Sequence, residues 1–401
     1  MYILIGKEFF MGVMVNELQQ ELNRIARYWS KMMDKEYGGY YGYVDYNLNL
    51  DKKSPKGGIL NSRILWFSSS LYCLNKDKDA LTMAQQAYEF LKTKLWDNEY
   101  KGIYWLVDYD GSLLDTRKHS YCQAFAIYGL TQYYRATGSK EALNLAIEIY
   151  NLIEKYCKDQ NGYTEEFTRE WKTKENEMLS ENGVMTEKTM NTHLHILEAY
   201  TVLYDVWKDE GLKKQLNYLL EIVYEKIYDN SKHYLKVFFD KKWNSLLDMQ
   251  SYGHDIEATW LIDRAAEVLG DKELIRNTFE YTQKIAQNIY DKAYSPKGMI
   301  NETVNDKTDK KRVWWVQAEA VIGFYNAYQK TGDTKFKDAS ESMWNYIKNY
   351  LIDKREGSEW YWLLDENSKP VAGKPIVEPW KCPYHNGRMC MEMIERIGKY
   401  V

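Results

Sequence analysis

Thr331-Gly332-Asp333 separates two stretches of helical periodicity near the end of the chain, and the same kind of turn occurs twice more. Thr137-Gly138-Ser139 and Leu269-Gly270-Asp271 also place a glycine before a residue that caps helices. Glycine suits the left-handed position after a helix, and a Ser or Asp side chain accepts hydrogen bonds from the first N–H groups of the next helix. The turn therefore predicts a helix–turn–helix joint that the fold uses repeatedly.

Apolar residues recur with the helical period on both sides of these joints. In residues 141–157, Leu143, Ala146, Tyr150 and Ile153 fall on one face of a helix. Similar apolar faces run through four further segments: 80–96, 213–227, 271–289 and 336–351. The chain is therefore predicted to be mostly α-helical.

Short aromatic stretches, most of them flanked by glycine, lie between the predicted helical hairpins. They occur at residues 38–43, 102–105, 162–163, 233–238, 298–300 and 359–362. Each is predicted to be a short strand or an extended loop. Successive stretches are about 60–70 residues apart, which leaves room for two helices and two connections. Six such units favour an all-α fold, a closed (α/α)6 barrel with the extended segments at one mouth.

A single barrel domain is predicted for most of the 401 residues. The length alone would suggest two or three domains, but no Pro/Ser-rich linker interrupts the repeat. Residues 1–14 have the character of an N-terminal extension. We therefore expect the catalytic barrel to span residues 15–401.

Charge and cysteine content exclude several classes of partner. The net charge is −4 and no basic block occurs, so nucleic acid is not an expected partner. No apolar run is long enough to cross a bilayer, so a membrane is not expected either. The five cysteines are odd in number and scattered, which favours a reducing compartment. A cytoplasmic protein is predicted; its oligomeric state is left open.

Aromatic residues are unusually frequent, with 36 Tyr and 14 Trp. Rings of this kind fill large cores. They also suit sugar pockets, because the C–H faces of a sugar ring lie well on Trp and Tyr. The composition is therefore compatible with a carbohydrate site.

Two segments place a histidine among aromatic, acidic and backbone-bending residues: 251–257, with His254, and 380–388, with His385. Histidine titrates near neutral pH, so it can both accept and donate a proton there. Two histidines that face one carbon atom from opposite sides could remove a proton and return another. This is the chemistry of an epimerase.

Spacing suggests how the two histidines are held. His254 and Glu257 are three residues apart on a predicted helix and share a face, and a carboxylate beside an imidazole fixes its tautomer and raises its pKa. The alternative is a buried His–Glu pair that only joins two helices. His385 lies between Pro383 and Gly387, which predicts a helix start or loop, where scaffolds often place pocket residues.

The other candidate residues carry weaker signals. His193 and His195 are two apart on a predicted helix, so they should point to different sides. His119 and His233 are interpreted as structural. Arg63, on an otherwise apolar helix, needs an ion pair or a ligand oxygen, and one of Trp314 and Trp315 should face inward. No zinc-type spacing or phosphate-binding glycine loop occurs, so neither metal nor cofactor is expected.

Together these motifs resemble the N-acylglucosamine 2-epimerase superfamily, and within it the members that act on β-1,4-linked disaccharides. The resemblance extends from about residue 17 to residue 396 and is carried by several long motifs in order. They are 61–67 (NSRILWF), 188–191 (KTMN), 194–195 (LH), 251–258 (SYGHDIEA), 312–319 (RVWWVQAE) and 380–389 (WKCPYHNGRM).

The resemblance implies an (α/α)6 barrel and reversible epimerisation at C2 of the reducing-end glucose, without a cofactor. Cellobiose would give glucosyl-mannose and lactose would give epilactose, with a ketose as a possible side product. It also implies that His254 and His385 are the acid/base pair and that His195 lies in the site. The residues implied to line the sugar site are Arg63, Asn191, Glu257, Trp314, Glu319 and Trp380.

Three alternatives remain open at this point. An inverting glycosidase on the same barrel would use two carboxylates, for which Glu257 and Glu319 are available. A non-catalytic sugar- or protein-binding module is a second alternative, but binding alone has no use for two proton carriers. The third is an N-acetylglucosamine or mannose enzyme of the same superfamily. The fold alone cannot distinguish them.

Overall fold

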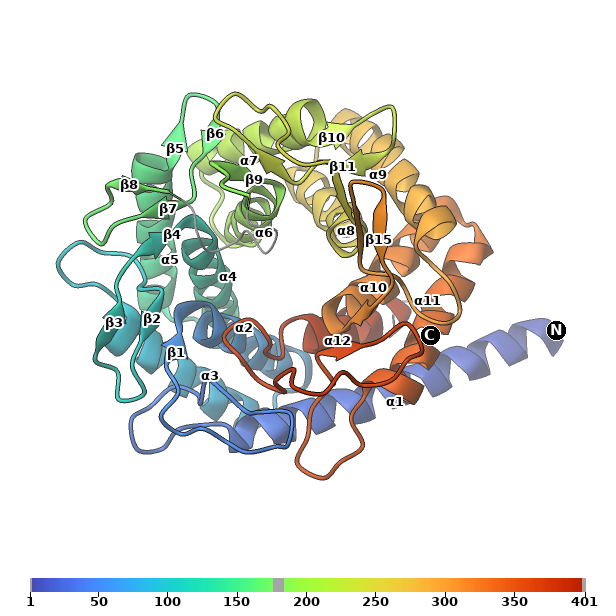
Figure 1. Ribbon diagram of the computed structural model, residues 1–401, viewed down its shortest axis with the longest axis horizontal. Coiled ribbons are helices and arrows are strands. Elements are labelled where there is room, and N and C mark those ends of the chain that lie inside the picture. Colours follow the sequence, from blue (N-terminus) through green and yellow to red (C-terminus); the bar gives the residue numbers. More distant parts are fainter. Residues whose placement is uncertain (1, 176–183, 399–401) are drawn as a thin grey trace.

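Inner and outer helices form two concentric rings in the computed structural model, which describes residues 2–175 and 184–398 (Figure 1). The inner ring consists of α2 (Gly58–Asn75), α4 (Ser120–Thr137), α6 (Met190–Val206), α8 (Tyr252–Leu269), α10 (Trp314–Thr331) and α12 (His385–Gly398). The outer ring consists of α1 (Tyr2–Lys31), α3 (Lys78–Phe90), α5 (Lys140–Leu152), α7 (Glu210–Ile222), α9 (Lys272–Lys292) and α11 (Thr334–Tyr346).

Helix packing closes the ring. Each inner helix packs against the next one, and α12 contacts both α10 and α2. Five inner helices form a hairpin with the outer helix that follows them, whereas α12 pairs with α1 from the other end of the chain. The predicted (α/α)6 barrel is confirmed, and its sixth hairpin joins the two ends of the sequence.

Burial differs between the two rings, and this explains the sequence pattern. In α2 the residues from Gly58 to Ser69 are all buried, because neighbouring helices cover both sides and α3 covers the back. The outer helix α5 buries one face only, formed by Ala142, Ala146, Ile149 and Tyr150. A helix with one apolar face shows clear periodicity in its sequence, whereas a helix buried all round does not.

The three predicted joints have the expected geometry. Gly138, Gly270 and Gly332 end their helices with φ of 73°, 78° and 72°. No atom lies within 4 Å of a Cβ built at any of them, so the left-handed backbone alone accounts for the glycine. Ser139 then accepts a hydrogen bond from the Ala142 N–H, and Asp333 accepts one from the Lys335 N–H.

Four outer helices end in the same way. After 13 residues of α-helix, each widens into a five-residue π-helical turn before it leaves the barrel wall. These turns are η1 (Leu91–Leu95), η2 (Ile153–Cys157), η3 (Val223–Ile227) and η4 (Ile347–Leu351). Four of the repeating units found in the sequence therefore share the same π-helical ending of the outer helix.

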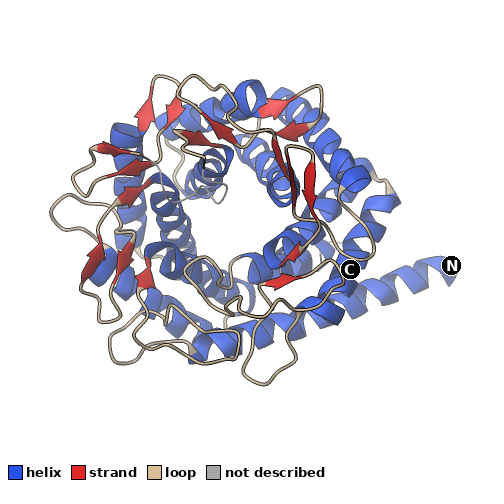
Figure 2. Ribbon diagram, viewed as in Figure 1, coloured by secondary structure: helices blue, strands red, loops and turns tan. Residues whose placement is uncertain are grey.

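Small antiparallel sheets of two or three strands gather at one mouth of the barrel (Figure 2). The strands are β1 (Lys56–Gly57), β2 (Leu106–Val107), β3 (Leu113–Asp115), β4 (Lys118–His119), β5 (Lys158–Asp159), β6 (Gly162–Tyr163), β7 (Glu166–Phe167), β8 (Thr173–Lys174), β9 (Lys188–Thr189), β10 (Tyr228–Asp229), β11 (Tyr234–Leu235), β12 (Phe238–Phe239), β13 (Met249–Ser251), β14 (Glu302–Val304), β15 (Lys307–Asp309), β16 (Arg312–Val313) and β17 (Leu363–Leu364). Of the predicted aromatic stretches, 162–163 is β6 and 233–238 contains β11. The other four are extended loops, and in three of them an isolated bridge pairs one residue with another segment: Tyr40, Ile103 and Trp360.

Ion pairs made by fully buried lysines fix the entry of the chain into three inner helices. In each case a lysine on the strand just before the helix pairs with an aspartate just after an outer helix. The pairs are Lys56 with Asp34 (2.5 Å), Lys118 with Asp97 (3.1 Å) and Lys188 with Asp159 (2.5 Å). The first two pairs are buried on both sides, whereas the Asp159 side chain is 34% exposed. Removal of one partner from a buried pair typically costs about 3–5 kcal/mol, because the other charge is left without compensation. The first turns of α2, α4 and α6 are therefore held firmly at the mouth.

The N-terminal residues continue the first outer helix. Helix α1 runs unbroken from Tyr2 to Lys31, and its N-terminal part projects beyond the ring in Figure 1. The extension predicted for residues 1–14 thus has no helix break at its boundary, although residue 1 lies outside the described residues. The division into extension and barrel stays a prediction.

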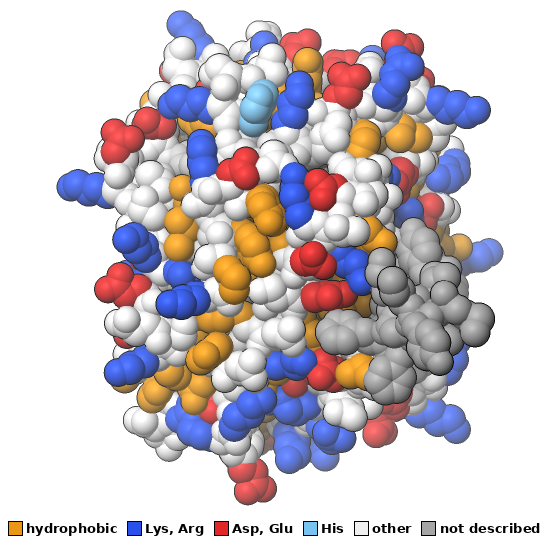
Figure 3. Space-filling model, turned by 90° about the vertical axis from the view of Figure 1, so that its right-hand side faces the viewer, with side chains coloured by type: hydrophobic (Ala, Val, Ile, Leu, Met, Phe, Trp, Pro, Cys, Tyr) orange, Lys and Arg blue, Asp and Glu red, His pale blue; other side chains and the backbone are white. Residues whose placement is uncertain are grey.

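The surface shows no segregation of charge on the face drawn in Figure 3, where Lys and Arg side chains alternate with Asp and Glu. Among the helices of the described residues, none combines the length and the apolar character that crossing a membrane requires. All five cysteines are free thiols.

Candidate active site

A cavity of about 560 Å³ opens at the mouth that carries the small sheets. Its floor is built mainly from the first turns of the inner helices. Eight of the nine predicted site residues line it: Arg63, Asn191, His195, His254, Glu257, Trp314, Trp380 and His385. The ninth, Glu319, is fully buried behind His385 and is not among the lining residues. Its role in substrate binding stays a prediction. In this geometry Glu319 contacts His385, and His385 lines the cavity.

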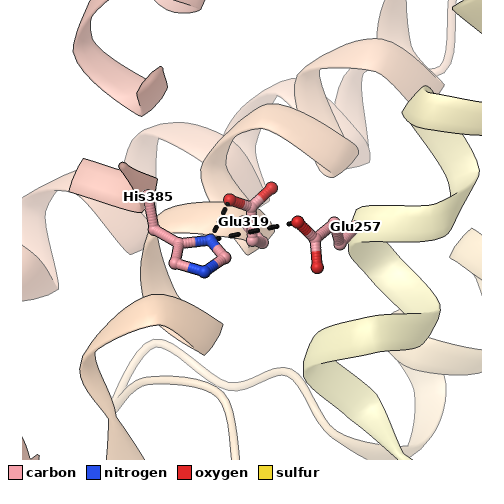
Figure 4. A group of neighbouring side chains, drawn as sticks. All are labelled: Glu257, Glu319 and His385. Atoms are coloured by element: carbon pink, nitrogen blue, oxygen red, sulfur yellow. Dashed lines mark hydrogen bonds and ion pairs between the residues drawn. The ribbon is translucent and has the colours of Figure 1, made fainter. Parts of the chain in front are cut away.

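His385 begins α12 and is oriented by a carboxylate from α10. Its Nδ1 lies 2.7 Å from Oε1 of Glu319, and Oε1 of Glu257 is 3.9 Å from the same nitrogen (Figure 4). Burial lowers the pKa of His385 well below its ordinary value, and the charges of Arg388 and Arg63 lower it further. The imidazole is therefore neutral near pH 7, with Nε2 left for a substrate.

His254, in the first turn of α8, is held differently from the sequence-based expectation. Its Nδ1 lies 2.8 Å from Oγ of Ser251, and no bond to Glu257 forms. The predicted His254–Glu257 pair is wrong because Arg388, from α12, binds the Glu257 carboxylate and draws it toward His385. Burial, followed by the influence of His195, lowers the pKa of His254 to about 3. This imidazole is neutral as well.

His195 and His193 point to different sides of α6, as predicted. His195 lines the cavity, and its Nδ1 is 2.8 Å from Oε2 of Glu198. Burial lowers the pKa of His195, although Glu198 opposes this shift. His193 is structural: its Nδ1 lies 2.7 Å from the Thr189 carbonyl oxygen, and its Nε2 accepts a hydrogen bond from the Tyr163 N–H.

Three polar atoms on cavity-lining residues have no hydrogen-bond partner among the described residues. They are Nε of Arg63, Oδ1 of Asn191 and Oε2 of Glu257. An unpaired buried polar atom costs about 1–3 kcal/mol, so such atoms point to a missing partner. One donor and two oxygens on three different helices match the needs of sugar hydroxyl groups.

Arg63 also joins the cavity floor to the loop above it. Its Nη1 donates to the Trp380 carbonyl oxygen (3.0 Å), and its Nη2 donates to the Tyr121 hydroxyl (2.7 Å). The guanidinium lies 4.1 Å from the centre of the Phe125 ring. The sequence predicted that this arginine needs an ion pair or a ligand oxygen. In the described residues it has neutral acceptors, so its charge remains available to a ligand.

Four tryptophans line the cavity: Trp314, Trp315, Trp362 and Trp380. The sequence predicted that one of Trp314 and Trp315 faces inward, but both do. The Trp315 ring centre is 4.6 Å from that of His254 and 5.4 Å from that of His385, so this ring contacts both histidines. Trp380 is half-buried on the loop before α12. The expectation of a single inward ring was too restrictive because the buried Trp314 and the partly buried Trp315 both border the cavity.

Two charged residues that the sequence analysis did not assign belong to the site. Glu198 orients His195, and the fully buried Arg388 contacts Glu198, Glu257 and Glu319. Each follows a cavity histidine by three residues on the same helix. The i, i+3 rule that singled out His254 and Glu257 would therefore have found both.

A group of possible metal ligands forms where sequence spacing showed none. Ligand atoms of Glu257, Glu319 and His385 all lie within 4.8 Å of one another (Figure 4). They come from three helices, so no local spacing could reveal them. The Arg388 guanidinium already donates to both carboxylates and supplies the positive charge that a cation would bring.

We therefore expect activity to be independent of added divalent ions. Dialysis of the purified protein against a chelator, followed by assay with and without Mg²⁺, Mn²⁺ or Zn²⁺, checks this. The expected result is a kcat within twofold of the untreated value in every case. Activity that disappears with the chelator and returns with one ion would show that these carboxylates bind a metal.

A second cavity of about 570 Å³ lies at the opposite mouth. Its lining includes Asp205, Arg264, Lys330 and Arg396, but none of the nine predicted site residues. Of the three carboxylates that Arg388 contacts, only Glu198 borders it. The histidines thus assign the chemistry to the cavity at the sheet-bearing mouth.

Comparisons with known proteins agree on one family. Residues 38–386 match the family model described as N-acylglucosamine 2-epimerase (GlcNAc 2-epimerase). A cellobiose 2-epimerase of Dictyoglomus turgidum is 48% identical over 388 residues, which cover 96% of this chain and all of the relative. One of Ruminococcus albus is 50% identical and covers 96% of this chain and 99% of its own. The solved cellobiose 2-epimerase of Bacillus thermoamylovorans superposes with a TM-score of 0.93 at 49% identity, covering 96% of this chain and 100% of its own.

Proposed function

Because the chain belongs to the N-acylglucosamine 2-epimerase family, we propose that it catalyses reversible C2 epimerisation of the reducing-end glucose of β-1,4-linked disaccharides. Cellobiose and lactose are the proposed substrates. The observation that carries the mechanism is the placement of His254 and His385. They come from different helices, line one cavity and contact the same Trp315 ring.

The chemistry begins with an open-chain sugar, because the C2–H bond of a closed pyranose is not acidic. In the aldehyde form, one neutral imidazole accepts the C2 proton and the carbonyl takes up the charge, which gives an enediolate. The second imidazole, neutral in the empty site, takes a proton from solvent once the negative charge of the enediolate lies beside it, and passes that proton to the opposite face of C2. Reprotonation at C1 instead would give the ketose side product.

The remaining lining residues suit the other needs of this reaction. The Arg63 guanidinium is placed to stabilise the oxyanion that develops at O1 or O2, and His195 supports it. Burial and the neighbouring Glu319 raise the pKa of Glu257 to about 8. Glu257 is therefore mostly protonated near pH 7, and its free Oε2 can donate a hydrogen bond to a sugar oxygen. The free amide oxygen of Asn191 accepts one from a hydroxyl group.

An inverting glycosidase is not favoured by the carboxylates. The two carboxyl groups of such an enzyme are about 6.5–9.5 Å apart, to leave room for a water molecule. Here the nearest oxygens of Glu257 and Glu319 lie within 4.8 Å. Both accept hydrogen bonds from Arg388, and Glu319 does not line the cavity.

Product analysis distinguishes the two functions. The purified protein is incubated with cellobiose, and the sugars are separated by anion-exchange chromatography. The proposal expects glucosyl-mannose to appear while the total amount of disaccharide stays constant. Free glucose would support a glycosidase. Activity on N-acetylglucosamine or mannose, but not on cellobiose, would support the other members of the family.

Trp380 is proposed to stack on the sugar. Its ring lines the cavity, while its carbonyl oxygen is bound by Arg63. An aromatic contact contributes about 0.5–1.5 kcal/mol beyond burial. We expect Trp380→Ala to raise KM for cellobiose by about 3–10-fold, which corresponds to that energy, and to lower kcat because C2 is less well placed.

Steady-state kinetics and a melting curve test this assignment together. Trp362, which also lines the cavity and donates from its indole Nε1 to Glu378, provides a comparison as Trp362→Ala. If Trp380→Ala lowers the melting temperature but leaves KM unchanged, the ring only packs the loop and does not bind substrate.

A further inference from the structure

Arg388 is a fully buried cation beside the candidate active site. It lies on α12, three residues after His385, and its side chain is fully buried. The guanidinium stacks 4.7 Å from the Trp260 ring centre and 4.1 Å from that of Tyr384. Arginine is rarely buried to this extent without a specific set of partners.

Its partners are three carboxylates from three other inner helices. Nη1 donates to Oε1 of Glu198 on α6 (2.6 Å), and Nη2 donates to Oε1 of Glu319 on α10 (2.7 Å). Nη2 also donates to Oε1 of Glu257 on α8. The fork of the guanidinium thus connects three helices behind the floor of the cavity.

Two of these carboxylates are the groups that hold cavity histidines. Glu319 binds Nδ1 of His385, and Glu198 binds Nδ1 of His195. Arg388 therefore stands behind two imidazoles without contacting the cavity itself, since it is not a lining residue. Any change in its charge or reach is passed to both rings through one carboxylate each.

The positive charge of Arg388 affects the protonation of the carboxylates that it binds. Burial raises the pKa of Glu257 and of Glu319 above the ordinary carboxyl value, and the Arg388 charge opposes part of that rise in both. The ionisable groups that face the guanidinium come from four helices and the loop before α12: Glu198, Glu257, Glu319, His385 and Tyr384. Without the guanidinium, a fully buried Glu319 would take up a proton.

We infer that Arg388 is a positioning residue that keeps Glu319 ionised, so that His385 carries its proton on Nδ1 and presents a bare Nε2 to the substrate. This inference rests on the proposed epimerisation. A protonated Glu319 would donate its O–H to Nδ1 and move the imidazole proton to Nε2, which then could not accept the C2 proton. The conserved-charge variant Arg388→Lys cannot span Glu198 and Glu319 together.

Arg396 offers a matched control on the same helix. It also lies near the Trp260 ring, at 5.9 Å, and is bound by Glu392, Asn326 and Gln329. It contacts none of the three carboxylates that Arg388 binds. Replacement of either arginine removes a charge from α12, but only Arg388 is connected to the histidines.

Kinetics of Arg388→Lys, Arg388→Met and Arg396→Met test the inference. We expect kcat for cellobiose to fall about 10-fold in Arg388→Lys and 10²-fold or more in Arg388→Met, with KM changed less than threefold. Arg396→Met should keep kcat within twofold. Arg388 variants that melt at lower temperature but retain wild-type kcat would overturn the inference.

The tautomer of His385 in the unaltered protein provides a test that does not depend on folding of a variant. Imidazole ¹⁵N chemical shifts, assigned with His385→Gln, should show a protonated Nδ1 and a bare Nε2 near pH 7.5. A proton on Nε2 would contradict the inference even if the protein epimerises cellobiose. If the wild type does not epimerise cellobiose, the proposed function fails instead, whatever the tautomer.

Discussion

Alanine at either His254 or His385 is expected to lower kcat for cellobiose epimerisation by about 10²–10⁴-fold, the usual contribution of a general acid or base. Each imidazole handles the proton on one face of C2, so neither can replace the other. Both are neutral in the empty site because burial lowers their pKa. The losses should appear in kcat, with far-UV circular dichroism unchanged.

His233 provides the control for this pair. It lies outside the cavity, with Nδ1 2.7 Å from the Tyr228 hydroxyl, and His233→Ala should keep kcat within twofold. Retention of more than about a tenth of wild-type activity in His254→Ala or His385→Ala would remove that histidine from the acid/base pair.

Glu319→Gln is expected to lower kcat on the order of 10²-fold or more. The amide has the shape of the carboxylate, but its NH₂ group can donate to Nδ1 of His385 and so shift the imidazole proton to Nε2. In the catalytic triad of serine proteases, the corresponding Asp→Asn change lowers kcat about 10⁴-fold, because the histidine then has the wrong tautomer. Oε1 of Glu319 also accepts a hydrogen bond from Arg388, and Oε2 accepts one from Trp260. With the NH₂ group turned toward His385, the amide oxygen keeps the bond from Trp260 and the bond from Arg388 is lost.

Glu392→Gln is the matched control for Glu319→Gln. Glu392 pairs with Arg396 at the opposite mouth and should tolerate the change without loss of kcat. Melting curves of the two variants show whether either change disturbs the fold. A Glu319→Gln protein with wild-type kcat would mean that the carboxylate does not set the tautomer of His385.

The fold was predictable because the outer helices bury one face only, and their sequences therefore show a clear helical period of apolar residues. All five predicted apolar faces belong to outer helices, for example 141–157 to α5 and its π turn. The inner helices α2, α4, α6, α8 and α10 are buried on most sides and show no such face, so they are inferred from the repeat length and the glycine joints. The pairing of α1 with α12 depends on closure of the ring, which no local pattern reveals.

The site was predictable only in part, and the reason is again the difference between local and tertiary contacts. Motifs located His254, His385 and Arg63, which the structure brings to one cavity. The expected His254–Glu257 pair fails because a competing guanidinium arrives from α12. Partners that come from other helices, such as Glu319 for His385, have no signature in spacing along the chain.

Incorporation of deuterium at C2 tests the central claim most directly. Cellobiose is incubated with the wild-type protein in D2O, and the reducing-end C2 position is followed by NMR as glucosyl-mannose forms. Two histidines that exchange protons with solvent predict deuterium at C2 of the new mannose residue, with none at C3 and no loss of the glycosidic bond. Epimerised product that retains its original hydrogen at C2 would contradict proton transfer between two solvent-exchanging histidines.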